Sequence, residues 1–434
     1  MPRKILFITT HNLATNPRLV KELQLAVSYN YKVSVICFEF ENWSKQLNEE
    51  IKSRFTEIDF YCINAGRKHF FSWLLSVAEE KIYRFLGKYF SLSDSRLSQA
   101  VSRRSNLIIN EIQKIKEADL VIGHNPGAIY PSIVASQRFN CKAGFDVEDY
   151  HPGEGNDVYI QQLTLNLMKR DLPSFDYLSF ASLPIQKKCL DEIHLDKKTI
   201  CLSVLNYFNS DEFLPPLKIS ATKLKLVWFS QNIDINRGLE NIIPVIKKFP
   251  DWIELHLIGN LSQRFEEILK NNQEILIHHS PMSQLSLHQK LSEFDIGLAA
   301  EDFEKESNRN LCLTNKIISY YQAGLYILAS DSIAQQEFLS SRTSHGKCFK
   351  NPAAFETDLK TLYENLITVR NEKNSRFESA KKENWENESM KLSLKWSVGK
   401  STQIDPLNPF ETDPLIPFQI DPLIPAEIDP LKIG

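Results

Sequence analysis

The sequence predicts an α/β protein with two Rossmann-like, doubly wound domains that face a cleft, followed by an extended or disordered C-terminal tail. Continuous apolar runs alternate with amphipathic segments, as buried parallel strands and their crossover helices require. This alternation starts at residue 4 and restarts at residue 224, after an aperiodic stretch that contains Pro215 and Pro216. From residue 405 an Asp-Pro-Leu motif recurs every eight residues, and this density of proline excludes helix and central strand.

These patterns set the expected boundaries of five segments. We expect a first Rossmann-like domain at 1–205, a linker at 206–222, a second Rossmann-like domain at 223–370, a helical segment that braces the two halves at 371–398, and a proline-rich octapeptide-repeat tail at 399–434. Four short repeats are too few to build a solenoid core, so the tail is predicted to be extended.

The bulk composition narrows the expected partners and location. The formal net charge of −3 gives no overall attraction to nucleic acid. The seven cysteines are scattered without metal-type pairs, which is typical of thiols in a reducing compartment. We find neither a signal-peptide pattern nor an apolar run of about 18 residues. We therefore expect a cytoplasmic protein without a membrane span.

Each apolar run predicts one strand. In the first half the predicted strands are Lys4–Thr10, Tyr31–Phe38, Asp119–Ile122, Ala143–Val147, Tyr177–Ala181 and Thr199–Val204. In the second half they are Leu224–Phe229, Ile253–Ile258, Glu274–His278, Asp295–Ala299 and Tyr326–Ala329. Loops at the carboxyl ends of such strands line the ligand crevice of doubly wound folds. The sequence has no Gly-rich dinucleotide turn and no Walker lysine pattern, which argues against a dehydrogenase or an NTPase.

Polar loops follow two strands of the first half. The loop after the first strand contains Asn12, Asn16 and Arg18. His124 follows the third predicted strand, and it is either a site residue or a histidine whose hydrogen bonds are satisfied inside the fold.

An acidic segment follows the fourth predicted strand. Between Asp146 and Glu154 the chain has four acidic groups and a histidine, including Glu148, Asp149 and His151. Hydroxyl recognition or general-base chemistry is one interpretation. A metal site is another, although the spacing matches no metal motif. The third is an ordinary acidic surface loop.

The segment Phe70–Phe90 is the most aromatic part of the chain, and its apolar residues recur at helical spacing. A basic, aromatic, amphipathic helix can lie on an anionic membrane. The alternative is a core helix with a solvated edge. The basic residues that flank the apolar face are Arg67, Lys68, Lys81, Arg84 and Lys88.

The segment Leu313–Asp331 predicts a helix and a buried strand. Thr314 is expected to cap the helix, with Asn315 and Lys316 in its first turn, and Gly324 ends it. A helix N-terminus that carries free amides and a cation is an anion site. The alternative is an ordinary αβ unit with a solvated lysine.

Three stretches together resemble the GT-B glycosyltransferases of the large retaining group that uses nucleotide-sugar donors. They are the start of the chain from ILFITTHNLATNPRLV, the segment LVWFSQNIDINRGLENII, and the segment LTNKIISYYQAGLYILASD. The resemblance implies a hexosyltransferase that moves a sugar to a glycan or lipid-linked acceptor, with retention and without a metal or cofactor. It also implies polysaccharide biosynthesis at the cytoplasmic membrane face, with peripheral contact through 67–90.

The resemblance implies roles for three groups of residues. The catalytic candidates, which stabilise the leaving diphosphate or orient sugar hydroxyls, are Arg237, Lys316, Asp149 and His124. The donor-binding candidates are Ser230, Gln231, Asn232, Gly238, Gly259, Glu301, Asn315 and Thr314. The acceptor-side candidates are Asn12, Asn16, Arg18, Glu148 and His151.

The sequence also departs from the family pattern. The two glutamates that many members carry fall here on Leu311 and Ser319, and the arginine of the phosphate loop is absent. Two alternatives therefore stay open beside the transferase. One is a nucleotide-sugar epimerase of the same fold, which acts without an acceptor. The other is a catalytically degenerate partner subunit.

Overall fold

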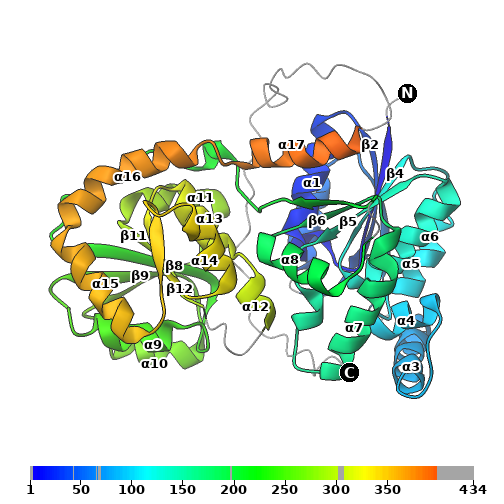
Figure 1. Cartoon of the computed structure of the whole chain (residues 1–434), viewed down its shortest axis with the longest axis horizontal. Coiled ribbons are helices and arrows are strands. Elements are labelled where there is room, and N and C mark those ends of the chain that lie inside the picture. The colour runs from blue at the N-terminus through cyan, green and yellow to red at the C-terminus, as the bar shows by residue number, and fades with distance from the viewer. Residues whose placement is uncertain are drawn as a thin grey trace. The chain divides into compact units, whose positions relative to one another are not determined.

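The computed structural model describes residues 3–42, 44–64, 66, 70–195, 198–301 and 307–397 (Figure 1). Within them the chain forms two compact units. The first unit contains the chain up to Leu205 and again from Ser389. The second unit contains Asn206–Glu388, including the predicted linker. The predicted tail at 399–434 lies outside the described residues, as do Arg67 and Lys68.

The first unit is built on a seven-stranded sheet with the order β3-β2-β1-β4-β5-β6-β7. All neighbouring strands are parallel. The strand order reverses between β1 and β4, and ligands of doubly wound folds bind at such a point. The strands are β1 (Lys4–Thr9), β2 (Lys32–Glu39), β3 (Asp59–Asn64), β4 (Leu120–His124), β5 (Lys142–Val147), β6 (Tyr177–Phe180) and β7 (Ile200–Ser203).

Helices cover both faces of this sheet (Figure 1). They are α1 (Pro17–Ser28), α2 (Lys45–Ser53), α3 (Phe70–Leu86), α4 (Asp94–Val101), α5 (Ser105–Ile112), α6 (Ile129–Phe139), α7 (Val158–Asp171) and α8 (Leu183–Glu192). One apolar cluster joins the inner face of β1, β2 and β4 to α5 and α6.

The second unit repeats the design with a six-stranded parallel sheet of order β10-β9-β8-β11-β12-β13. Its strands are β8 (Leu224–Ile233), β9 (Ile253–Leu261), β10 (Leu276–His279), β11 (Ile296–Ala299), β12 (Tyr326–Ser330) and β13 (Gly346–Phe349). Its helices are α9 (Leu239–Ile246), α10 (Gln263–Lys270), α11 (Gln284–Lys290), α12 (Ser307–Leu311), α13 (Asn315–Gln322), α14 (Ile333–Ser340), α15 (Pro352–Glu364) and α16 (Leu366–Ala380). α17 (Trp385–Trp396) begins in the second unit and ends in the first. Among the described helices, none is long and apolar enough to cross a membrane.

The two sheets confirm the predicted pair of doubly wound α/β halves. The sequence analysis missed the edge strands β3 and β13. The residues of β3 are half-buried or exposed, and exposed Lys347 interrupts the short strand β13, so neither strand has a continuous apolar run. It also ended β8 too early. Ser230, Gln231 and Asn232 were predicted as a loop but lie inside β8, which passes through a register shift between Phe229 and Asn232.

The predicted helical segment at 371–398 contains the end of α16 and all of α17 as far as the described residues extend. The basic residues of α16 are not solvated, however. Arg370 donates to both carboxylate oxygens of Asp295 at 2.8 and 2.9 Å, and Lys373 Nζ donates to the carbonyls of Ser292 and Phe294 at 2.7 and 2.5 Å. These charges hold α16 against the second sheet.

Candidate functional site

Arg18 from α1 forms a buried ion pair with Asp146, near the end of β5. Arg18 Nε donates to Asp146 Oδ2 at 2.6 Å and Nη2 donates to Oδ1 at 2.9 Å, while Nη1 donates to the carbonyl of Val204 at 2.8 Å. Burial would raise the pKa of Asp146, but the Arg18 charge and the hydrogen bonds hold this pKa below its ordinary value. Arg18, predicted on the acceptor side, is only 3% exposed. Its placement favours a structural role.

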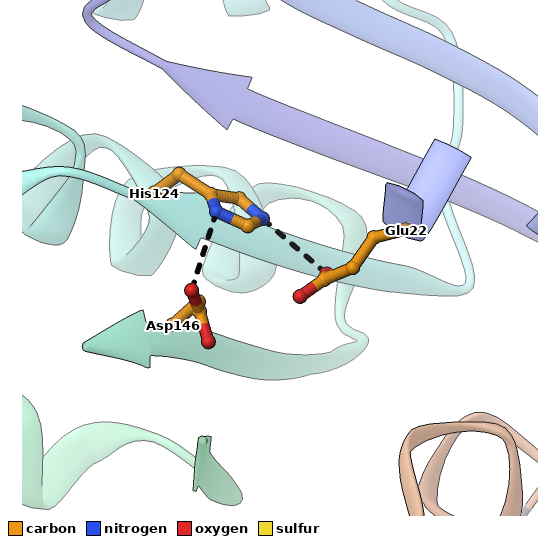
Figure 2. Close-up of side chains that lie close together, drawn as sticks. All are labelled: Glu22, His124 and Asp146. Carbon is orange, nitrogen blue, oxygen red and sulfur yellow. Dashed lines mark ion pairs between the residues drawn. The ribbon is translucent and has the colours of Figure 1, made fainter. Parts of the chain in front are cut away.

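His124, the last residue of β4, is buried between two carboxylates (Figure 2). Its Nε2 lies 3.3 Å from Glu22 Oε2, and its Nδ1 lies 3.7 Å from Asp146 Oδ2. Burial alone would lower the pKa of His124, but the Glu22 carboxylate outweighs burial and the pKa is raised. His124 is fully buried, so its ring is out of reach of a bound substrate, and this placement favours the structural interpretation of His124.

Glu22, His124 and Asp146 also form a group whose ligand atoms are close enough to hold a metal ion (Figure 2). Both oxygens of Asp146 already accept hydrogen bonds from Arg18, whose charge opposes a cation there. The cluster pairs a guanidinium and an imidazole with two carboxyl groups. Its chemistry therefore fits a buried charge network better than a metal site.

Asn12 and Asn16, also predicted on the acceptor side, shape the loop after β1. Asn12 Oδ1 accepts from the amide and the hydroxyl of Thr15 at 3.1 and 2.7 Å, and Asn12 Nδ2 donates to Ser44 Oγ at 2.5 Å. Asn16 caps α1, because its Oδ1 accepts from the Leu19 amide at 3.1 Å. Both side chains are buried, and their hydrogen bonds hold the loop in shape.

Asn125, directly after β4, has a backbone conformation that L-residues rarely adopt, with φ 69° and ψ 149°. Thr9 Oγ1 donates to Asn125 Oδ1 at 2.6 Å, and Asn125 Nδ2 donates to Glu148. Burial raises the pKa of Glu148 to about 7, and the carboxylates of Asp149 and Asp146 add to the shift. Backbone strain held by such contacts is typical of functional sites.

A cavity of about 240 Å³ opens at the carboxyl ends of β1, β4 and β5. The polar side chains that line it include His11, Arg104, Asn125, His151 and Glu154. His151 Nδ1 lies 3.0 Å from Glu154 Oε1, and the His151 amide donates to the carbonyl of Asp149 at 2.9 Å. Of the predicted acceptor-side residues, His151 is the one that faces this cavity.

In the second unit, Gly259 lets two neighbouring strands approach closely. It has φ +146°, and a Cβ at this position would lie 1.9 Å from the Ser230 carbonyl oxygen. The approach follows the register shift in β8. Ser230 and Asn232 are half-buried and Gln231 is exposed, so this part of the predicted phosphate loop lies at the surface of the second unit.

The segment before α9 contains the predicted Arg237 and Gly238. Gly238 has φ +80°, and its missing side chain admits the backbone of Glu301, whose carbonyl carbon would lie 3.2 Å from an added Cβ. Arg237 is partly exposed, and its side chain forms no hydrogen bond or ion pair with the described residues. A free guanidinium therefore lies next to the N-terminus of α9.

Lys316 lies in the first turn of α13, as predicted, but it is not solvated. Its Nζ lies 2.5 Å from Glu301 Oε1 and 5.1 Å from the centre of the Trp228 ring. Thr314 occupies the N-cap position, yet its buried hydroxyl caps nothing and has no hydrogen-bond partner in the described residues. The capping prediction is therefore wrong, and the first-turn amides of α13 lack that partner. Asn315 Oδ1 accepts from Asn206 Nδ2 at 2.8 Å.

Ser319, where the resemblance implies a glutamate, is buried in α13. His288 Nε2 lies 3.1 Å from Ser319 Oγ, and His288 Nδ1 lies 2.7 Å from Glu212 Oε2. The Phe213 ring stacks on the His288 ring with centroids 4.5 Å apart. These contacts form an enclosed hydrogen-bonded chain that ends in a carboxylate.

The sequence analysis did not single out Arg104, Glu22 or His288. Glu22 and His288 lie within helices, where a polar residue normally marks a solvated face. Arg104 lies between α4 and α5 and reaches Thr10, which is 94 positions away. The one local signal was the pair of arginines at 103 and 104 between two serines, and this pattern does not indicate which residues Arg104 contacts.

No protein-family model matches the sequence, and no curated protein matches it. Sucrose-phosphate synthase from Thermosynechococcus elongatus superposes with a TM-score of 0.62 and 12% identity, over 91% of this chain and 98% of that chain. HepE from Anabaena in complex with UDP superposes with a TM-score of 0.61 and 12% identity, over 91% of this chain and 99% of that chain. A structure described as trehalose-6-phosphate from E. coli bound with UDP-2-fluoro glucose superposes with a TM-score of 0.58 and 12% identity, over 90% of this chain and 98% of that chain. At such identities the likeness establishes the fold, and the chain has the GT-B architecture.

Glu148 makes stability depend on pH with a definite sign. Its pKa in the folded protein, about 7, lies above the ordinary 4.5, so the folded state holds the proton more tightly. This contribution to stability is complete below pH 4.5 and is lost as the pH rises through about 7. Glu148→Gln cannot ionise, and its amide oxygen can still accept from Asn125. The variant should therefore gain stability over the wild type above pH 7, by on the order of 2 kcal/mol after allowing for partial exposure.

Urea denaturation at pH 5 and pH 8 measures this difference. Glu49→Gln, on the exposed side of α2, is the control and should leave the pH profile unchanged. Parallel profiles for the wild type and Glu148→Gln would show that Glu148 is not the responsible group.

Proposed function

We propose that this chain is a glycosyltransferase that moves a sugar from a nucleotide-diphosphate sugar to a glycan or lipid-linked acceptor. The observation that carries the proposal lies within the second unit. The backbone before α9, at Gly238, packs against the backbone of Glu301, and Lys316 at the start of α13 forms an ion pair with the Glu301 side chain. Two helix N-termini that are distant in sequence are therefore brought together at the carboxyl end of β11.

The chemistry of sugar transfer explains why this arrangement suits a diphosphate. Breaking the bond between the anomeric carbon and the diphosphate leaves negative charge on the phosphate oxygens. Arg237 offers a guanidinium without a partner in the described residues, and α13 offers amides that no side chain caps. Lys316 adds a cation that Glu301 and Trp228 hold in place. Fixed charges of this kind stabilise developing charge without reorganisation.

The proposal includes retention of configuration and no metal. In front-face attack the donor phosphate helps to deprotonate the acceptor hydroxyl, so no protein nucleophile is needed. Arg237 and Lys316 would supply the positive charge that a metal supplies in other transferases. Glu301, whose buried Oε1 forms an ion pair with Lys316 Nζ, would keep the lysine charge in place and can accept a donor hydroxyl without giving up this pair.

The compared structures support the choice of donor. HepE was solved with UDP, with UDP and glucose, and with UDP-glucose, and the structure from E. coli contains UDP-2-fluoro glucose. We accordingly propose a nucleotide-diphosphate sugar as the donor of this chain.

A panel of nucleotide sugars, each incubated with the full chain with and without a panel of acceptor glycans, tests the proposal. We expect release of free nucleotide diphosphate that depends on the acceptor, together with a glycosylated product. Isomerised donor without any acceptor would show an epimerase instead. Absence of binding to every donor would rule out both enzymes and leave a non-catalytic partner subunit.

Removing either cation should slow transfer. Lys316→Ala and Arg237→Ala should each lower kcat by roughly 10²–10³-fold, a few kcal/mol, as measured when one charge-stabilising donor is lost from other enzymes. Steady-state kinetics measure the effect. Lys270→Ala, in the last turn of α10 in the same unit, is the matched control and should keep the wild-type rate. Unchanged turnover in both test variants would show that the diphosphate binds elsewhere.

The exposed face of α3 supports a membrane-peripheral location, at the cytoplasmic membrane face. α3 and the turn after it expose large apolar side chains instead of burying them in a core, so the alternative of a core helix is not observed. Exposed Lys81 and Lys88 accompany this face. The combination is typical of helices that lie on anionic lipid. We propose peripheral contact through 67–90. The exposed apolar residues are Phe70, Phe71, Leu74, Leu75, Ile82, Phe85, Tyr89 and Phe90.

Charged substitutions on this face should abolish vesicle binding. We expect the full chain to cosediment with vesicles of phosphatidylglycerol and phosphatidylcholine, and the double variant Phe71→Glu, Phe85→Glu to bind more than tenfold more weakly, because each buried aromatic side chain contributes about 1.5–3 kcal/mol. Ile367→Glu, at a side chain that is 77% exposed in the second unit, is the control. Equal binding of the double variant and the wild type, or no binding by either, would contradict the proposal.

A further inference from the structure

The cavity at the carboxyl ends of β1, β4 and β5 contains a cation that folding does not neutralise. The Arg104 guanidinium lies 4.7 and 5.5 Å from the ring centres of Phe40 and Phe38, and its Nη1 donates to the Thr10 carbonyl at 2.7 Å. Among the described residues it forms no ion pair with a carboxylate. Burial and the charge of Arg103 lower the pKa of Arg104 to about 10, so it stays protonated at neutral pH.

His151 supplies a second donor to the same cavity. Its Nδ1 lies 3.0 Å from Glu154 Oε1, whereas its Nε2 is buried and has no hydrogen-bond partner in the described residues. Burial would lower the pKa of His151, but the Glu154 carboxylate raises it to about 9. The ring therefore carries a proton on Nε2 that lacks an acceptor. An unsatisfied buried donor destabilises the folded protein, and a ligand oxygen that accepts from it would remove this penalty.

His11 reports the sign of the potential in the cavity. Burial lowers its pKa, and the charges of Arg104 and His151 lower it further, to about 4. His11 is therefore neutral, and its buried Nδ1 has no partner among the described residues. A neutral imidazole beside two cations can hydrogen-bond a sugar hydroxyl.

The acidic groups of the neighbouring loop offset only part of this charge. Glu154 is engaged with His151, and Glu148 accepts from Asn125. Asp149 is the further carboxylate that acts on His11 and His151. Arg104 Nη1 donates to the Thr10 carbonyl, which leaves the Nε and Nη2 side of its planar fork for a ligand, and this side matches the two oxygens of a carboxylate or phosphate.

We propose that this cavity is an anion subsite, in which Arg104 and His151 bind a carboxylate or phosphate carried by the acceptor. Its volume of about 240 Å³ is below the roughly 300–1,000 Å³ of pockets for drug-sized ligands, so it suits one acidic sugar residue. That the anion belongs to an acceptor rests on the proposed transferase function. Anion binding itself rests on the cavity alone.

The test uses small sugars that differ only in charge. Glucuronate, glucose 6-phosphate and glucose are titrated into the full chain, with calorimetry for affinity and NMR of nitrogen-labelled histidine for contact. We expect at least one acidic sugar to bind ten times or more tighter than glucose and to shift the Nε2 signal of His151, which the variant His151→Gln identifies. Arg104→Gln should lose most of that preference and leave the weak binding of glucose unchanged.

Arg138→Gln is the matched control, because Arg138 lies on the surface of α6 in the same unit and donates to Gln113. Arg104→Lys keeps the charge without the fork, and it should bind with intermediate affinity. If Arg104→Gln does not fold, the histidine NMR of the wild type still decides. Equal affinity for glucose and both acidic sugars, or no shift of the His151 signal, would overturn the inference.

The same experiment distinguishes an acidic sugar from a phosphorylated acceptor, and it distinguishes failure of the anion subsite from failure of the proposed transferase function. Preference for glucuronate indicates an acidic sugar, and preference for glucose 6-phosphate indicates a phosphorylated acceptor. A parallel titration with UDP reports on the donor site. Acidic sugar binding without UDP binding would sustain the anion subsite and count against the transferase. Transfer to neutral acceptors without any anion preference would do the reverse.

Discussion

The buried pair of Arg18 and Asp146 is the interaction on which the site of the first unit depends. One guanidinium joins α1 to the end of β5 and, through the Val204 carbonyl, to the segment after β7. Ser179 from β6 donates to the same carboxylate at 2.6 Å. Removing one partner of a buried pair costs about 3–5 kcal/mol, because the other charge is left uncompensated. The pair therefore fixes the strand ends next to Asn125, which lines the cavity, and Glu148, which accepts a hydrogen bond from Asn125.

Cations in this chain divide into those that folding compensates and those that it leaves available. Arg18 binds both oxygens of Asp146, and Arg370 does the same with Asp295. Arg104 and Arg237 have no carboxylate partner in the described residues. Both lie in loops next to the carboxyl ends of parallel strands, where doubly wound folds bind ligands. An uncompensated cation destabilises the folded state slightly, and a bound anion restores the balance.

Apart from the edge strands β3 and β13, the strands and the layout of both units could be predicted from apolar runs, because a strand buried on both faces has no polar positions to obscure it. The functional loops could be located for the same reason, since they follow those runs. The roles within the loops could not. Asn16 and Arg18 have the polar character of ligand-binding residues, but in the folded chain Asn16 caps α1 and Arg18 forms a buried ion pair with Asp146. Arg104 belongs to the cavity through contacts with Thr10 and Phe40, which no local pattern contains.

Ser319 shows what the departure from the family pattern changes. A glutamate at this position of α13 would bring a second carboxylate into an enclosed site that already holds Glu212, and like charges that close disfavour each other's ionisation. In this chain the site has the Glu212 carboxylate instead, and His288 connects it to Ser319 of α13. The N-terminus of α13 keeps the features that suit a diphosphate, namely Lys316 and the uncapped amides after Thr314. Under the proposed function, the groups of the second unit that would bind phosphate are therefore separate from position 319, and recognition of the nucleoside would come from other residues.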